Sequence, residues 1–280
     1  MPTIDINDIT IHYEIAGQGP AVLFVHGMCG DAEVWADQAA RLSDRYTCVR
    51  YDRRGHTRST RGDAPTSYAL NTDDAAALIE ALGLAPCLLV GSSGGAAISV
   101  DVLRRHGRLL RGAVLSEPPL FSMAPAAGRA LLDDVLPLVE RAIETGGPRA
   151  GVDAFFAKVC PGLWSTIDEA RKDRYRANGD VGFAEVQAAP LAITADDLAT
   201  VTTPVLVISG DESHPSFGAV AHELATALPD AALVELKGSG HVTYAEQPEQ
   251  FANAVSVFAA ELDRRAASGH GSLTRVTSRR

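Results

Sequence analysis

The sequence predicts an α/β protein in which helices flank a mostly parallel central sheet. Two observations support this fold class. Between residues 21 and 117, short apolar runs alternate with stretches of helical periodicity, the order expected of parallel strands joined by right-handed crossovers. The first run, residues 21–25, is apolar at every position, as expected of a strand whose two faces are both buried.

The other elements follow from local patterns. A β-hairpin is expected first, because residues 3–16 alternate polar and apolar side chains around Asn7 and Asp8. Asp31 is the expected cap of a helix that ends near Ser43. Further strands are expected at residues 46–51, 88–90, 112–116, 204–210 and 232–236. Further helices are expected at residues 70–82 (capped by Asn71 or Thr72), from Ser93 to 106, at 216–228, and along the apolar stripe of Phe251, Val255, Phe258 and Leu262.

The alternation of strands and helices stops near Leu120. Residues 121–199 contain only helical patterns, which are expected at residues 129–144, 152–159, 168–177 and 183–192. We therefore predict that residues 121–199 form a helical lid, inserted into a core made of residues 1–120 and 200–266. Residues 267–280 are polar and are expected to be a disordered tail.

Composition limits the classes of partner. The 280 residues, 46% of them hydrophobic, can bury one large core. No apolar run approaches the roughly 20 residues of a membrane helix, and no signal-peptide pattern is present, so we expect a cytoplasmic protein with no membrane partner. A formal charge of -10 argues against a nucleic-acid partner. The four cysteines show no C-x-x-C spacing and are expected to be reduced core thiols rather than disulfides or metal ligands.

A G-x-S-x-G pattern at residues 91–95 is the centre of the predicted site. It follows an apolar strand and precedes a helix, where a serine would sit in a strained turn and point over the sheet edge. We interpret Ser93 as a nucleophile, with Ser92 as the rival hydroxyl. The Gly94 amide starts the helix, where free N–H groups favour developing negative charge. The pattern alone is also compatible with a plain turn.

Four sequence pieces in this order resemble the α/β-hydrolase family over residues 3–266. They are His26-Gly27-Met28, Asp52-Arg53-Arg54-Gly55-His56, Gly91-Ser92-Ser93-Gly94-Gly95, and Gly240-His241 before the final amphipathic helix. The resemblance implies an α/β-hydrolase fold, with Ser93 as nucleophile and His241 as the base that deprotonates it. It also implies that the amides of Met28 and Gly94 form the oxyanion hole. His26 is expected to shape the oxyanion loop, and His56 to brace the turn after Asp52.

The acid of the implied triad has three candidates. Relatives usually carry an aspartate three residues after the glycine that ends the strand at residues 204–210, and this sequence has Ser213 there. Asp211 and Glu212 are close by, but either would require a shifted loop. Glu117 ends the strand next to that of Ser93, which resembles the acid position in some branches of the family, zearalenone lactonases among them. Glu117 is our favoured acid, with a helix-capping or lid-gating carboxylate as the alternative.

The predicted ligand is an apolar small molecule. The lid would cover the carboxyl ends of the strands, and it contains Phe121, Met123, Leu132, Phe155, Phe156, Trp164 and Phe183. From these we select Phe121, Met123 and Trp164 as substrate-binding residues, together with Trp35 beyond the oxyanion loop. Each could instead hold the lid to the core. The sequence has no metal cluster, dinucleotide fingerprint or phosphate loop, so no metal and no cofactor are expected.

Taken together, the sequence favours a serine hydrolase that cleaves a carboxylic ester or lactone through an acyl-enzyme. One alternative applies the same triad to a carbon–carbon bond, an amide or peroxide. Another alternative is a ligand receptor of this fold with negligible turnover. The fold alone does not choose between them, because it supports many chemistries. Nothing in the sequence specifies an oligomeric state.

Overall fold

A computed structural model of the chain describes residues 2–188 and 191–268. In these ranges eight strands form one sheet, in the order β1-β2-β4-β3-β5-β6-β7-β8. The first strands, β1 and β2, form the predicted hairpin, and β2 also pairs antiparallel with β4. All other pairs are parallel. The strands are β1 Thr3–Ile6, β2 Ile9–Ala16, β3 Ala21–Val25, β4 Thr47–Tyr51, β5 Cys87–Ser92, β6 Leu110–Ser116, β7 Val205–Gly210 and β8 Ala231–Leu236.

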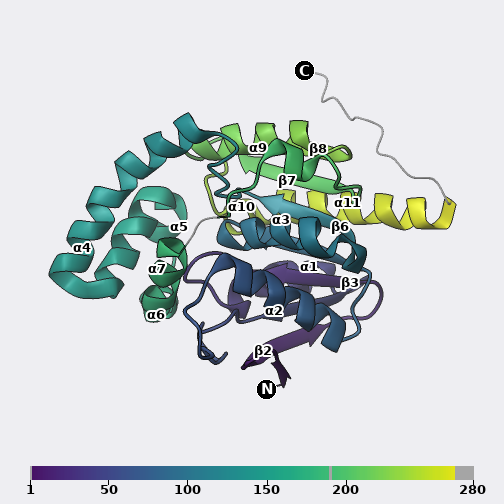
Figure 1. Cartoon of the computed structure of the whole chain (residues 1–280), viewed down its shortest axis with the longest axis horizontal. Helices are drawn as coiled ribbons and strands as arrows, with labels where there is room; N and C mark the ends of the chain where they lie inside the picture. Colours follow the sequence, from purple (N-terminus) through teal and green to yellow (C-terminus); the bar gives the residue numbers. More distant parts are fainter. Residues whose placement is uncertain (1, 189–190, 269–280) are drawn as a thin grey trace.

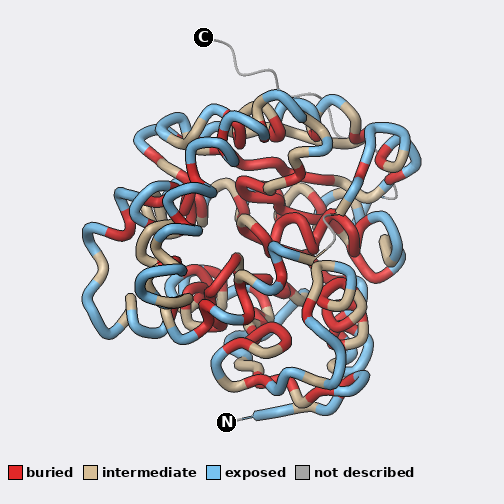
Figure 2. The backbone as a smooth tube through the Cα atoms, turned by 60° about the vertical axis from the view of Figure 1, so that its left-hand side comes forward, coloured by how far each residue is buried: buried red, intermediate tan, exposed pale blue. Residues whose placement is uncertain are grey.

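Helices cover both faces of this sheet (Figure 1). The side chains of β3 alternate between two cores, with Leu23 and Val25 in one and Val22 and Phe24 in the other. The first core also contains side chains of α2 Tyr68–Ala81, α3 Gly94–His106 and α9 Pro215–Ala227. The second contains side chains of α1 Ala36–Leu42 and α11 Pro248–Ser268, including the predicted apolar stripe. Figure 2 shows buried stretches of the chain gathered in its interior, and β3, β5 and β6 are buried at nearly every position.

The helix cap predicted at Asn71 or Thr72 is wrong. Helix α2 begins at Tyr68, and the side chain of Ser67 caps it by accepting a hydrogen bond from the Leu70 amide at 3.2 Å. Asn71 and Thr72 lie inside the helix, where each side chain donates to a backbone carbonyl one turn earlier. The helix capped by Asp31 is confirmed, starting as a short turn Ala32–Trp35 that continues into α1.

The segment between β6 and β7 is helical, as predicted. Its elements are α4 Pro125–Val159, α5 Pro161–Thr166, α6 Glu169–Ala177, α7 Gly179–Gln187 and α8 Ala195–Leu198. We call this segment the insertion, and α4 to α7 lie together beside the sheet in Figure 1. Helix α4 joins two predicted helices across Gly147, whose φ of 74° interrupts the helix before Pro148.

Two further expectations concern the cysteines and the tail. All four cysteines are free and buried, as expected. Of the predicted disordered tail, Ala267 and Ser268 end α11, and residues 269–280 lie outside the described residues. Within the described ranges, none of the helices is both long and apolar enough to cross a membrane.

Helix α3 packs unusually close to β3 at Gly95. A methyl group there would lie 2.2 Å from the Val25 carbonyl oxygen and 2.6 Å from that of His26. We expect Gly95→Ala to lower the free energy of unfolding by about 1–3 kcal/mol, because rigid backbone must move to make room. Urea unfolding followed by circular dichroism measures the change.

Gly218→Ala in α9 is the matched control. Apart from its two chain neighbours and the backbone of its own helix, no atom lies within 4 Å of the added methyl group. The variant should therefore gain about 0.5–1 kcal/mol through helix propensity. Equal stability of the two variants would contradict the argument from packing.

Candidate active site

Ser93 stands at the turn between β5 and α3. Its backbone adopts φ 53° and ψ -125°, a conformation that residues other than glycine rarely adopt. The Ser93 amide donates to the Ser116 carbonyl on neighbouring β6 at 2.8 Å, which holds the turn in place. The turn also needs Gly91, because a methyl group there would lie 2.4 Å from the Gly95 carbonyl oxygen. The G-x-S-x-G pattern is therefore a packing requirement of this turn.

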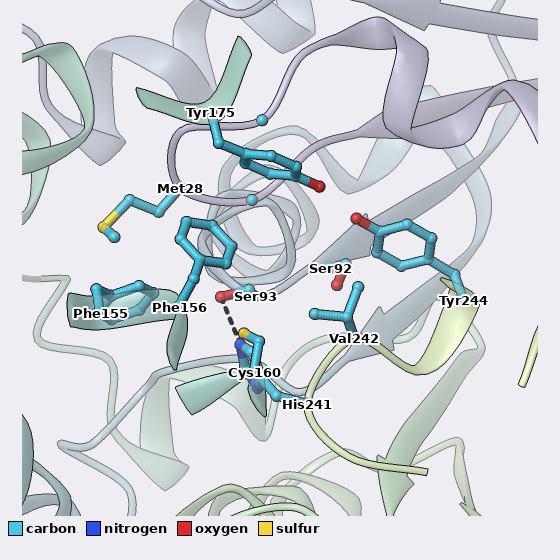
Figure 3. Close-up of a pocket in the computed structure, with 12 residues that line it drawn as sticks. Met28, Ser92, Ser93, Phe155, Phe156, Cys160, Tyr175, His241, Val242 and Tyr244 are labelled. Atoms are coloured by element: carbon cyan, nitrogen blue, oxygen red, sulfur yellow. Dashed lines mark hydrogen bonds between the residues drawn. The ribbon is translucent and has the colours of Figure 1, made fainter. Parts of the chain in front are cut away.

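Three side chains form a hydrogen-bonded series at the carboxyl ends of the strands. The Ser93 Oγ lies 3.0 Å from Nε2 of His241, and Figure 3 draws this contact as a dashed line. The Nδ1 of His241 lies 3.1 Å from Oε2 of Glu117. His241 and Glu117 are both buried. Because the carboxylate accepts a hydrogen bond from the Nδ1–H group, the proton stays on Nδ1 and Nε2 keeps a lone pair for the Ser93 hydroxyl. Ser93, and not Ser92, makes the contact with the imidazole.

The carboxylate of Glu117 is held by three donors. Besides His241, the Gly210 amide donates to Oε1 at 2.8 Å and the Ser213 hydroxyl donates to Oε2 at 2.5 Å. Ser213 is at the position where the sequence resemblance implied an aspartate. Its hydroxyl therefore supports a carboxylate that arrives from the neighbouring strand. The Glu117 backbone has φ 53°, and its amide donates to the Ile208 carbonyl, which fixes the residue against β7.

The two other acid candidates face elsewhere. The Asp211 carboxylate accepts from the Gly238 amide at 2.7 Å and from the Ser239 amide at 3.3 Å, so it braces the loop that leads to His241. The Glu212 side chain is exposed, and its amide donates to the Ser239 carbonyl. Of the three candidates, the structure brings only Glu117 to the imidazole.

Met28 and Gly94 lie next to one another beside Ser93. A methyl group on Gly94 would be 3.6 Å from the Met28 amide nitrogen and 3.2 Å from the Tyr68 hydroxyl. Gly94 is the first residue of α3, so its amide has no carbonyl one turn earlier to bond. Gly27 lets the loop approach, since its own added methyl group would be 3.1 Å from Cβ of Ser93. Both predicted oxyanion residues therefore adjoin Ser93.

A pocket of about 30 Å³ opens at Ser93. Aromatic side chains from the insertion and from the loop after His241 dominate its walls (Figure 3). Its lining comprises Gly27, Met28, Gly30, Ser92, Ser93, Phe155, Phe156, Cys160, Tyr175, His241, Val242 and Tyr244. This volume holds only a few atoms, because even one water molecule needs about 10–15 Å³.

Two tyrosines supply polar groups to the pocket. The hydroxyls of Tyr175 and Tyr244 point toward one another in Figure 3. Burial raises the pKa of Tyr175 to about 12, and it raises the pKa of Tyr244 well above its usual value. Both phenols therefore stay protonated at neutral pH and can donate hydrogen bonds. Burial also raises the pKa of the Cys160 thiol, which stays neutral.

The four substrate-binding residues predicted from sequence do not line this pocket. Trp35 is fully buried in the core, with its ring centroid 5.2 Å from that of Phe24. Trp164 stacks behind Phe156 at 4.9 Å and is shielded by it. Phe121 packs on Phe217, whose ring lies 4.1 Å from that of His241, and Met123 packs against the core that contains α2 and α3. Each of these side chains is used in packing instead.

Sequence reasoning missed four aromatic residues that line the pocket, because their sequence patterns only weakly indicate a place in the site. Phe155 and Phe156 are adjacent aromatic residues, and their pattern predicts only an apolar helix face. Tyr244 lies three residues after His241, in the same glycine-rich turn and short helix, α10 Thr243–Glu246. Tyr175 is an ordinary helical residue of α6 by pattern. Nothing local indicates that it faces Ser93.

His26 and His56 are structural, as expected. The His26 Nε2 accepts a hydrogen bond from the Arg53 amide at 3.0 Å, and its Nδ1 lies 2.9 Å from the Gly27 carbonyl oxygen. Burial lowers the pKa of both histidines well below the usual value, so both are neutral. Among the described residues, no group of three or more His, Cys, Asp or Glu side chains is arranged to hold a metal ion.

The comparison with protein families bears on this geometry. A model of the alpha/beta hydrolase family matches residues 22–254, which include most of both parts of the core and the whole insertion. The chain belongs to the alpha/beta hydrolase family. The mostly parallel eight-stranded sheet flanked by helices is the fold of this family, as the sequence pieces implied.

Individual members of the alpha/beta hydrolase family are moderately similar. The uncharacterized hydrolase YraK of Bacillus subtilis is 37% identical over 123 residues, which are 43% of this chain and 45% of that protein. The 2-(acetamidomethylene)succinate hydrolase of Mesorhizobium japonicum is 29% identical over 266 residues, 91% of this chain and 93% of that one. The enol-lactonase of Burkholderia xenovorans shares the fold, with a TM-score of 0.74 at 24% identity over 92% of this chain and 100% of that one.

Proposed function

We propose that the protein is a serine hydrolase that cleaves a carboxylic ester or lactone of a small apolar molecule. The proposal rests on one observation, the hydrogen-bonded series of Ser93, His241 and Glu117 at 3.0 and 3.1 Å beneath a pocket. A serine hydroxyl attacks poorly at neutral pH unless a base accepts its proton. This series supplies the base and a carboxylate to orient it.

The proposed reaction has two halves. Ser93 Oγ attacks the carbonyl carbon while Nε2 of His241 takes its proton, and the resulting oxyanion accepts hydrogen bonds from the amides of Met28 and Gly94. The carbon–oxygen bond to the leaving alcohol then breaks, and His241 returns the proton to that alcohol. In the second half, water attacks the acyl-enzyme with the same proton transfers, which releases the acid and frees Ser93.

Glu117 serves the imidazole in both halves. It accepts a hydrogen bond from the Nδ1–H group, which keeps Nε2 turned toward Ser93. Its negative charge stabilises the imidazolium that forms at each step. The donors at Gly210 and Ser213 keep the carboxylate turned to His241.

The pocket favours a short acyl group. A volume of about 30 Å³ leaves no room for a long chain beside Ser93 unless Phe155 and Phe156 move. Apolar walls suit an apolar substrate, and the phenols of Tyr175 and Tyr244 offer donors to one polar atom of it. We therefore place acetyl-sized esters and small lactones ahead of long-chain lipids.

An amide substrate is the second candidate. The relative from Mesorhizobium japonicum is named as a hydrolase of an acetamido compound, and it matches this chain over nearly its whole length. The same triad cleaves amides if His241 protonates the departing nitrogen. Turnover of acetamides with inert esters would favour this candidate over ours.

The proposed acid makes a testable prediction. Glu117→Gln should lower kcat by about 10⁴-fold, because an amide cannot stabilise the imidazolium or enforce the right tautomer. Asp211→Asn should keep nearly full activity, since an amide oxygen can still accept from the Gly238 and Ser239 amides. Hydrolysis of p-nitrophenyl acetate measures both.

Ser93→Ala serves as the inactive reference, and thermal unfolding shows that each variant is folded. A dead Asp211→Asn beside an active Glu117→Gln would move the acid and leave the function standing. The receptor alternative would be favoured if the wild type cleaves none of the esters, lactones and amides, and if it binds a ligand with the same affinity as Ser93→Ala.

Acyl length tests the size of the pocket. Across p-nitrophenyl acetate, butyrate and octanoate, we expect kcat/KM to fall as the chain lengthens, because the longer acyl groups collide with Phe155 and Phe156. Phe155→Ala should raise kcat/KM for the octanoate relative to the acetate. A wild-type preference for octanoate would contradict the proposed short acyl group.

A further inference from the structure

Groups inside and outside the loop at residues 26–30 hold its carbonyl oxygens. From inside, the Gly30 amide donates to the Gly27 carbonyl at 3.2 Å, and Nδ1 of His26 lies 2.9 Å from the same oxygen. Arg53 donates from Nε to the His26 carbonyl at 3.0 Å and from Nη2 to the Gly27 carbonyl at 3.2 Å. The Gly27 carbonyl and the Met28 amide belong to one planar trans peptide, so they point in opposite directions. Holding the Gly27 oxygen therefore aims the Met28 N–H.

Arg53 is itself held by the insertion. Its guanidinium forms an ion pair through two nitrogens with Glu185 on α7, and both side chains are fully buried. Asn71 of α2 donates to the same carboxylate at 2.8 Å. A buried arginine that loses its carboxylate partner leaves an uncompensated charge, so the position of Arg53 depends on Glu185.

A second contact from the insertion holds the other end of the loop. Asn178, buried between α6 and α7, donates from Nδ2 to the Cys29 carbonyl at 3.2 Å and to the Gly30 carbonyl at 3.0 Å. Its Oδ1 accepts from the Thr57 amide at 2.9 Å. One side chain thus joins the insertion, the loop at residues 26–30 and the loop that follows β4.

The backbone of α7 also touches the loop directly. A methyl group on Gly182 would lie 2.4 Å from Sγ of Cys29 and 3.1 Å from Cγ of Met28. No space separates the helix from the loop, so α7 cannot swing away without breaking buried polar contacts on both sides.

We propose that α6 and α7 are a fixed positioning element of the oxyanion site, not a flap that opens for substrate. Glu185, through Arg53, and Asn178 are positioning residues that set the direction of the Met28 amide. This inference rests on the proposed function for its catalytic consequence. The contacts that carry it do not involve Ser93, His241 or Glu117.

Two variants test the inference. Glu185→Gln removes the charge opposite Arg53, and Asn178→Ala removes the donor to Cys29 and Gly30 with less risk to folding. Each should lower kcat on p-nitrophenyl acetate by about 10²-fold while KM changes little, because an oxyanion donor acts on the transition state and not on bound substrate. A methyl boronic acid, which forms a tetrahedral adduct with a serine, should lose affinity by a similar factor.

Asp173→Asn is the control from the same part of the insertion. Asp173 lies on α6 and forms exposed ion pairs with Arg149 and Arg176, away from the loop. It should leave kcat and boronate affinity unchanged. All assays are run well below the unfolding temperature of each variant, so that lost stability alone does not lower the rate.

Hydrogen–deuterium exchange of the peptide covering residues 26–30 separates this inference from the proposed function. Exchange should be faster in Glu185→Gln and in Asn178→Ala than in wild type, with Asp173→Asn unchanged. If the wild type hydrolyses nothing, the proposed function fails and the exchange result still decides the positioning. Unchanged exchange in two folded variants, or unchanged kcat in an active enzyme, would overturn the inference.

Discussion

The hydrogen bond between Glu117 and His241 depends on more of the fold than any other contact in the site. It requires β6 and β7 to be neighbours, because the carboxylate ends one strand and its supporting donors, Gly210 and Ser213, follow the other. It also requires the loop braced by Asp211 to present the imidazole. The Ser93 amide donates to the carbonyl of Ser116 on β6, the residue just before Glu117. Strand β6 therefore sets the positions of both Ser93 and Glu117, the two hydrogen-bonding partners of His241.

The two carboxylates near the end of β7, Glu117 and Asp211, have different tasks because their partners differ. Asp211 accepts from two backbone amides and shapes a loop, whereas Glu117 is turned toward an imidazole by an amide and a hydroxyl. Ser213 could not orient the imidazole by charge. It contributes by donating to the carboxylate that does, which explains how a site with this arrangement remains complete without an aspartate at that position.

The insertion contributes buried polar contacts to the core as well as apolar walls to the pocket. Burying Arg53 and Glu185 costs desolvation, and the geometry offsets this cost only because each group has several partners. Such a pair is sensitive to displacement. The ion pair therefore fixes the position of the insertion relative to the core. The aromatic packing around Phe156 and Trp164 would tolerate small shifts.

The sequence by itself determined the parallel sheet and the turn at Ser93, and it indicated His241 as the proposed base, because these depend on local patterns: apolar runs, closely spaced glycines and a histidine after a strand. It left Glu117, Asp211 and Glu212 open as the acid, and it misplaced Trp35 and Trp164. Only the tertiary structure decided which carboxylate meets His241 and which aromatic rings face Ser93. The choice of carboxylate depends on which strands are neighbours in the sheet. The choice of rings depends on how helices far apart in the chain rotate against one another, because an amphipathic pattern shows that a face is buried without showing what it meets.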